Sequence, residues 1–143
     1  MILQSTAFAN QGQIPEKYTC KGRNVSPPLQ IQDVPPTAQS LVLICDDPDA
    51  PGKTFLHWLV WDMDPAAAEI PEATEPGTGG RNDFGKSRYG GPCPPSGIHR
   101  YYFRLYALDT KLGLAEGSSR RDVETAMEGH TIAEATLMGT VPA

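Results

Sequence analysis

The sequence predicts a mainly β protein, an antiparallel β-sandwich with one or two short helices. Its strongest hydrophobic patterns alternate with the two-residue period of a strand rather than the period of a helix. The 14 glycines and 14 prolines disfavour a helical bundle. Strands do not alternate with helices along the chain, which argues against a parallel sheet. A length of 143 residues suits one domain spanning residues 1–143.

Two strands are predicted in the first half of the chain. Residues 39–45 form an apolar run typical of a buried central strand. The segment 46–53 is predicted to be a turn, because its two prolines cannot continue a hydrogen-bonded ladder. Residues 55–63 form the second strand. Strict alternation divides its side chains between one face with Phe55, His57, Leu59, Trp61 and Met63, and another with Leu56, Trp58 and Val60.

The second half contains two more predicted strands. Residues 64–95 hold no convincing element beyond turns, and an irregular stretch of this length is usually functional. Residues 101–108 follow as a strand, and the alternating positions place four side chains on one face: His99, Tyr101, Phe103 and Leu105. Small and apolar residues alternate with polar ones over 132–141, which predicts the last strand.

One helix is predicted, over residues 120–128. Ser118 or Ser119 offers an N-cap, and Gly129 is typical of the residue that follows a helix. The spacing of its apolar residues predicts that Val123, Ala126 and Met127 are buried.

Charge and cysteine content restrict the function classes. Twelve basic against 17 acidic residues give a net charge of −5, so nucleic acid is not expected as a partner. No apolar run approaches the ~20 residues of a membrane span, and the first residues lack a secretory pattern, so no membrane insertion is expected. The three cysteines, Cys20, Cys45 and Cys93, include no close pair. We therefore expect free thiols and a cytoplasmic location.

A phosphate-binding P-loop pattern occurs over residues 80–87, as Gly-Arg-Asn-Asp-Phe-Gly-Lys-Ser. A working P-loop follows a strand and opens a helix whose amides hold the phosphates. Here a Gly-rich turn precedes the pattern, and the proline-rich segment 90–95 follows it within a few residues. We expect the match to be accidental.

The two histidines His57 and His99 allow several interpretations. Each lies near the start of a strand after a proline-rich turn, with Asp47 and Asp49 in the turn before His57. They are either ordinary core histidines or two ligands of a metal triad with an aspartate. A hydrolase using both histidines and an aspartate is the alternative function. However, no G-x-S-x-G occurs, and Cys93 is a weak candidate for a nucleophile in its proline-rich loop. No metal or other cofactor is predicted.

A small anion is the ligand that these residue types suit best. Histidine and tyrosine donors together with glycine-rich backbone can surround an oxyanion closely. We expect both imidazoles to donate to one anion, with Asp47 or Asp49 orienting one of them. An aspartate beside an anion is otherwise repulsive, unless it receives an ammonium group, so a zwitterion such as phosphoethanolamine also suits the site.

Several segments together resemble a known family. They are Asp-Asp-Pro-Asp-Ala-Pro at 46–51, His-Trp at 57–58, Gly-Gly-Pro-Cys-Pro-Pro-Ser-Gly-Ile-His-Arg-Tyr at 90–101, Asn-Val-Ser-Pro-Pro-Leu at 24–29 and Leu-Met-Gly-Thr at 137–140. In order and spacing they resemble the phosphatidylethanolamine-binding protein family, most closely its bacterial and archaeal Raf-kinase-inhibitor-like branch. The resemblance covers nearly the whole chain.

The resemblance implies a large antiparallel sheet packed on a smaller one, with a pocket at one end for phosphate-like groups, including phospholipid headgroups. It also implies a binding protein rather than an enzyme, acting on a kinase or a serine protease as inhibitor or regulator, with a homodimer by analogy. No catalytic residue is implied. The matching positions of the pocket are Asp47, Asp49, Pro51, His57, Gly91, Pro92, His99 and Tyr101.

Two features bear on the implied pocket. The chain stops at Ala143, without the C-terminal helix that borders the pocket in eukaryotic members, so a more open pocket is expected. Arg81, Lys86 and Arg88 lie in a segment that matches the bacterial branch. They either add positive charge near the pocket or form a solvated loop face.

Overall fold

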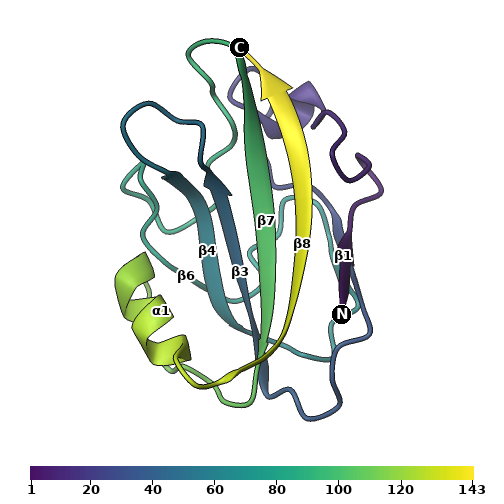
Figure 1. The fold of residues 1–143 in the computed structure, drawn as a ribbon, viewed down its shortest axis with the longest axis vertical. Helices are drawn as coiled ribbons and strands as arrows, with labels where there is room; N and C mark the ends of the chain where they lie inside the picture. The colour runs from purple at the N-terminus through teal and green to yellow at the C-terminus, as the bar shows by residue number, and fades with distance from the viewer.

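The computed structural model describes all 143 residues as two antiparallel sheets and a single α-helix (Figure 1), which confirms the predicted fold class. The larger sheet has the order β6-β4-β3-β7-β8, and the smaller sheet has the order β1-β2-β5. The strands are β1 (Ile2–Gln4), β2 (Leu29–Gln32), β3 (Ser40–Asp47), β4 (Phe55–Met63), β5 (Glu69–Ile70), β6 (Thr78–Gly79), β7 (Ile98–Leu108) and β8 (Thr131–Pro142). The helices are α1 (Arg120–Met127) and a 3₁₀ turn, η1 (Glu16–Tyr18).

The strand β3 is buried on both faces of the larger sheet. Its side chains alternate between the core shared with the smaller sheet, where Leu41 and Leu43 lie, and the core beneath α1, where Val42 and Ile44 lie. A central strand covered on both sides reads as a continuous apolar run. The prediction of a central strand is confirmed. The strand continues to Asp47, so the two residues Asp46 and Asp47, predicted to lie in the turn, belong to its end.

The strand β4 does not alternate strictly, and the predicted division of its faces is wrong. Its pairing with β3 shifts register at two places, one opposite Cys45 and Asp46 and one near Asp62, which has a positive φ. Each extra residue reverses which side chains face inward. As a result Trp58, Val60 and Met63 join the core between the sheets, while Leu56, Leu59 and Trp61 pack beneath α1.

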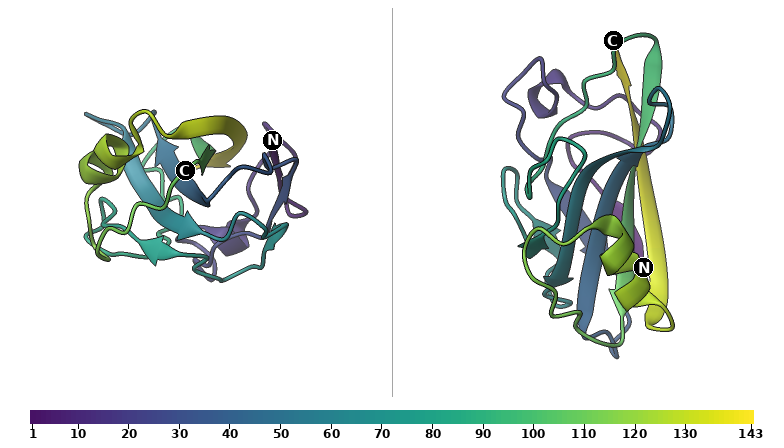
Figure 2. Two further views of the ribbon diagram at one scale, coloured as in Figure 1. Left: turned by 90° about the horizontal axis from the view of Figure 1, so that it is seen from below. Right: turned by 90° about the vertical axis from the view of Figure 1, so that its left-hand side faces the viewer.

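The strands β7 and β8 form the longest ladder, from the pair Ile98–Pro142 to the pair Leu108–Thr131. The four side chains predicted to share a face of β7 are all buried: His99, Tyr101, Phe103 and Leu105. Seen from the side, the long strands form one curved layer, and the teal loops that link β4 to β7 lie on a single side of it (Figure 2).

The helix α1 begins as predicted, with Ser119 as its N-cap. The hydroxyl oxygen of Ser119 accepts a hydrogen bond from the Asp122 amide at 3.1 Å. Val123 and Met127 are buried and Ala126 is half-buried. Neither α1 nor η1 is long and apolar enough to cross a membrane.

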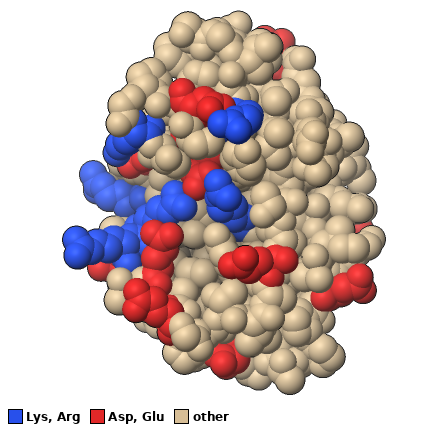
Figure 3. Space-filling model, viewed as in Figure 1, with Lys and Arg blue, Asp and Glu red and all other residues tan.

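Charged side chains gather on the half of the outer face nearest to α1 (Figure 3). There the buried Asp46 carboxylate pairs with Arg104 at 3.1 Å and with Arg120 at 3.0 Å. Because neighbouring side chains of a strand point to opposite faces, Asp47 points to the other side of the sheet. The two adjacent aspartates therefore serve different purposes.

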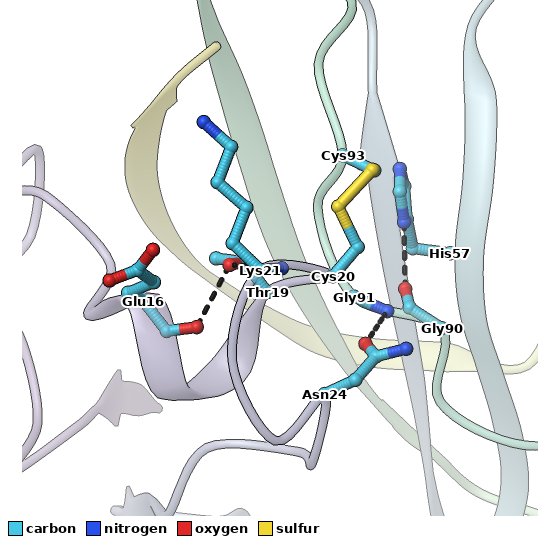
Figure 4. Close-up of a disulfide and its surroundings, with 9 residues drawn as sticks. All are labelled: Glu16, Thr19, Cys20, Lys21, Asn24, His57, Gly90, Gly91 and Cys93. Atoms are coloured by element: carbon cyan, nitrogen blue, oxygen red, sulfur yellow. Dashed lines mark hydrogen bonds between the residues drawn. A yellow bond between two sulfur atoms is a disulfide. The ribbon is translucent and has the colours of Figure 1, made fainter.

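A disulfide joins Cys20 and Cys93, so the expectation of three free thiols is wrong (Figure 4). The two residues are 73 positions apart in the sequence, and their Cα atoms lie 5.4 Å apart. They meet because the loop after η1 packs against the segment after β6, where the Cys20 amide donates to the Pro92 carbonyl at 3.0 Å. Only Cys45 is free, and it is buried. Cysteine usage consequently no longer supports the expected cytoplasmic location.

Removing this disulfide is expected to destabilise the fold. Closing a loop of this length restricts the unfolded chain, so the double variant Cys20→Ser/Cys93→Ser should lose about 2–4 kcal/mol of unfolding free energy. Thermal unfolding should show a fall in Tm on the order of 10 °C. Reductant should lower the Tm of the wild type similarly and leave the double variant unchanged. An equal response of both proteins to reductant would contradict the assignment.

Candidate functional site

A cavity of about 360 Å³ lies at the end of the sandwich where β3 ends and where β4 and β7 begin. Side chains from these strands form part of its lining, and the loop segments 50–51, 84 and 93–95 supply the rest. The lining residues are Asp47, Ala50, Pro51, Phe55, His57, Phe84, Cys93, Pro94, Pro95, His99 and Tyr101. Of the predicted site residues, the structure therefore brings together Asp47, Pro51, His57, His99 and Tyr101.

His99 and Asp47 form a buried pair on neighbouring strands. The Nδ1 atom of His99 donates to Oδ2 of Asp47 at 2.6 Å, and the other oxygen, Oδ1, accepts from the Asp49 amide at 2.8 Å. No fully buried side-chain nitrogen or oxygen in the protein lacks a hydrogen-bond partner. Because Nε2 of His99 has no protein partner, this atom is accessible from the cavity. The sequence predicted that either Asp47 or Asp49 would orient one imidazole. In the structure Asp47 does so, for His99.

His57 is held in a similar way by a backbone group. Its Nδ1 atom donates to the Gly90 carbonyl at 2.7 Å (Figure 4), and its Nε2 atom has no protein partner. Burial lowers the pKa of His57, against the opposing effects of the Gly90 carbonyl and of the carboxylates of Asp47 and Asp83. At neutral pH this imidazole is therefore uncharged, and its Nε2 atom offers a lone pair rather than a proton. The expectation that both imidazoles donate to one anion stays a prediction.

The Tyr101 ring lies close to both imidazoles. Its centroid is 5.2 Å from that of His57, with the rings edge to face, and 6.5 Å from that of His99, with the rings nearly parallel. Burial, followed by the negative charge of Asp47 and a hydrogen bond with its side chain, raises the pKa of Tyr101. The hydroxyl group thus keeps its proton.

The other walls of the cavity are apolar. Phe55 and Phe84 contact each other and the His57 ring, and prolines complete the lining. Phe84 is 44% exposed and lies at the rim. The cavity thus combines four polar side chains, those of Asp47, His57, His99 and Tyr101, with apolar walls. This arrangement suits a small polar group attached to an apolar one.

Asn82 positions the loop that carries Phe84. Its side-chain amide donates to the carbonyls of His57 and Arg88, and its oxygen accepts from the amides of Phe84 and Lys86. This buried residue falls within the P-loop pattern. A short strand, β6, precedes the pattern where a turn was expected, but the next helix begins only at Arg120. The helix that a P-loop needs directly after the pattern is absent.

Three predicted site residues lie outside the cavity lining. The Asp49 carboxylate accepts three hydrogen bonds from Arg100, which lower its pKa to about 2 and attach the loop after β3 to β7. Gly91 donates its amide to Asn24, and Pro92 accepts from Cys20, so both belong to the packing behind the wall. A side chain at Gly91 would collide with the Tyr18 carbonyl.

The basic residues of the loop also lie apart from the histidines. Lys86 and Arg88 line a separate hollow with Arg23 and Phe84, and Arg81 lies in another hollow beside α1. None of the three loop cations contributes to the cavity lining.

Sequence reasoning missed the aromatic and proline walls: Phe55, Phe84, Pro94 and Pro95. Phe84 directly precedes Gly85 in a segment without a predicted strand or helix, and an aromatic residue in such a loop is the signal that was available. The supporting role of Asn82 has no comparable signal, because it depends on which carbonyl groups reach the loop.

Two features bear on the catalytic alternatives. No group of three histidine, cysteine, aspartate or glutamate side chains is arranged to hold a metal ion. The lining includes no serine or threonine, and the sulfur of Cys93 is bonded to Cys20, so Cys93 is not a free thiol.

The fold and this cavity define a two-sheet β-sandwich protein with a histidine-containing cavity at one end. The family model for the phosphatidylethanolamine-binding proteins matches residues 4–142, and the chain belongs to this family. This finding confirms the resemblance seen in the sequence.

Relatives of this chain occur in archaea and bacteria. The UPF0098 protein of Methanothermobacter thermautotrophicus is 51% identical, with 97% of each chain covered. The UPF0098 protein of Aquifex aeolicus is 46% identical, with 97% of this chain and 86% of the relative covered.

Two crystal structures are close to this one. A phosphatidylethanolamine-binding protein homologue from Chlamydia trachomatis has a TM-score of 0.96 and 42% identity, covering 99% of this chain and 97% of its own. E. coli YbcL, a member of the mammalian PEBP family, has a TM-score of 0.90 and 30% identity, with the same coverage.

The state of His57 can be measured directly. We expect its imidazole to titrate below the ordinary value of ~6.5, because burial disfavours the cation. In Asp47→Asn the midpoint should fall further, since a carboxylate that favours the cation is lost. NMR titration of the imidazole signals of both proteins tests this expectation. A His57 midpoint at or above 6.5 in the wild type would show that burial does not dominate.

Proposed function

We propose that this chain is a binding protein whose cavity receives a phosphate-like oxyanion carried by a small molecule or a headgroup. One observation supports this most strongly. The Nδ1 atoms of His57 and His99 are both occupied by protein acceptors, so both Nε2 atoms remain for a ligand in one cavity. The Tyr101 hydroxyl group adds a donor at the same place.

The Asp47 carboxylate is compatible with an anionic ligand because its oxygens are already occupied. One accepts from His99 and the other from the Asp49 amide. A hydrogen bond between the His99 ring and an oxyanion, which is a charged acceptor, contributes roughly 1.5–3 kcal/mol.

The proposed role is binding rather than catalysis. Membership of the phosphatidylethanolamine-binding protein family supports a binding role, and the one cysteine of the lining is held in a disulfide. A kinase or a serine protease, the partner classes that the resemblance implies, would reach this cavity through a phosphorylated or acidic group. In this proposal the chain regulates such a partner by binding that group of the partner in its cavity.

Calorimetric titration with inorganic phosphate tests the proposal. His99→Ala should weaken binding at least tenfold, because a hydrogen bond to the charged phosphate is lost, and Tyr101→Phe should weaken it less. The matched control is His130→Ala. His130 also pairs with an aspartate, Asp109, at 2.7 Å, but it is exposed and does not line the cavity. Unchanged affinity in His99→Ala, with a Tm within a few degrees of the wild type, would show that His99 is a structural residue.

A further inference from the structure

We propose that a basic hollow beside the cavity is a docking site for the acidic flank of a phosphorylated segment of a partner protein. The basic hollow has a volume of about 390 Å³ and contains the side chains of Arg23, Lys86 and Arg88 in its lining. The cavity holds the phosphate group, and the basic hollow holds carboxylates of neighbouring residues in the same segment. The inference rests on the proposed function and deepens it, because it specifies the chemistry that surrounds the phosphate.

The charge of the basic hollow is the first argument. Three cations line it, Arg23, Lys86 and Arg88, and no aspartate or glutamate does. None of the three forms a salt bridge within the protein. The chain as a whole carries a net charge of −5, so an acidic partner is repelled by the average surface. The basic hollow therefore attracts such a partner at one place and beside the cavity.

Carboxylates close to the basic hollow already have partners of their own. Glu72 is near enough to Arg23 to interact with its charge, but Lys17 holds this carboxylate at 2.7 Å. Glu75 accepts from the Trp58 indole at 3.0 Å and from a backbone amide at 3.3 Å. Neither glutamate lines the basic hollow. The three cations consequently remain available to an acidic group from outside.

One peptide unit separates the cavity from the basic hollow. The Gly90 carbonyl is bonded to Nδ1 of His57 in the cavity at 2.7 Å, and the Gly91 amide donates to Oδ1 of Asn24 in the basic hollow at 2.8 Å (Figure 4). This peptide unit is trans, so its carbonyl and its N–H group point in opposite directions. His57 and Asn24 therefore lie on opposite sides of it. A ligand that occupies both places has only this narrow segment to cross.

The Phe84 ring forms the crossing, since it lines both the cavity and the basic hollow. It covers Gly90 so closely that a side chain at Gly90 would overlap the ring. Alternate side chains of an extended peptide lie on the same side, about 7 Å apart. Such a peptide places a phosphoserine in the cavity and an acidic side chain beyond Phe84. A membrane surface suits the place less well, because Phe84 is the only exposed large apolar side chain in either lining.

The walls of the basic hollow are fixed before a partner binds. The segment that carries Arg23 is attached to the segment before β7 by the disulfide between Cys20 and Cys93. In the opposite wall, the Lys86 amide donates to the buried Asn82 side chain at 3.1 Å. Because these backbones are already ordered, binding costs little conformational entropy beyond that of the exposed side chains.

Two phosphoserine peptides test the inference by calorimetry. One carries two glutamates on each side of the phosphoserine, and the other carries glutamines at the same positions. The wild type should bind the glutamate peptide at least fivefold more tightly at low ionic strength, because several exposed ion pairs form. Added salt should reduce this preference, since it screens exposed charges.

A pair of double variants with the same change of charge locates the effect. Lys86→Gln/Arg88→Gln should reduce the preference for the glutamate peptide to less than twofold. Both side chains are exposed, so the Tm should stay within a few degrees of the wild type. The control Lys111→Gln/Arg121→Gln removes two exposed cations that also lack salt bridges but lie outside both linings, and it should keep the full preference.

The two proposals fail in different ways. If neither peptide binds, or if His99→Ala leaves both affinities unchanged, the proposed anion site is wrong. If both peptides bind equally well and depend on His99, the anion site stands and docking in the basic hollow is overturned. A preference that persists in Lys86→Gln/Arg88→Gln also overturns it. Tighter binding to phosphatidylglycerol vesicles than to the glutamate peptide, lost in the same variant, would assign the basic hollow to a membrane and overturn the inference.

Discussion

The hydrogen bond between Asp47 and His99 is the interaction on which the cavity depends. A carboxylate buried at the end of a central strand is costly unless it is paired. The backbone of β3 gives Asp46 and Asp47 opposite directions, and each finds a different partner. Asp46 takes two arginines on the outer face, while Asp47 takes an imidazole that turns its free nitrogen to the cavity. The cavity's polar side therefore follows from strand alternation and from the need to pair a buried charge.

The other side of the cavity comes from loops without regular structure. The segment between β6 and β7 is attached at three places: by Asn82 to the start of β4, by the Gly90 carbonyl to His57 and by the disulfide to Cys20. Each attachment satisfies backbone groups or restricts the unfolded chain, so a long loop keeps one conformation. The same attachments fix the tautomer of His57, so the architecture of the loop and the chemistry of the site are linked.

Family membership and site geometry answer different questions about this protein. The match over residues 4–142 and the close structural neighbours identify the family and the fold. The roles of individual side chains come from hydrogen-bond partners. Asp47 and Asp49 occupy one motif, yet Asp49 is bound to Arg100 outside the cavity. His57 and His99 look equivalent in the sequence, yet Nδ1 of His57 is bonded to a backbone carbonyl and Nδ1 of His99 to a carboxylate.

The sequence by itself determined the long elements. A continuous apolar run predicted β3, and alternation predicted β7 and β8. The N-cap and the apolar spacing predicted α1, and the motifs placed most of the polar site residues. These signals are local, because they arise from the period of each element and from its ends. Short strands such as β1, β2, β5 and β6 contain too few residues to show a period, and the sequence left them unrecognised.

Only the tertiary structure decided the features that depend on distant partners. The two register shifts of β4 appear when it pairs with β3, and they reverse the faces that strict alternation assigns. Cys20 and Cys93 are brought together by packing across 73 residues, which no spacing rule detects. Asp47 rather than Asp49 holds an imidazole because only Asp47 ends the strand beside β7. In each case the deciding contact joins residues far apart in the chain, so its energy depends on the assembled fold and not on local sequence.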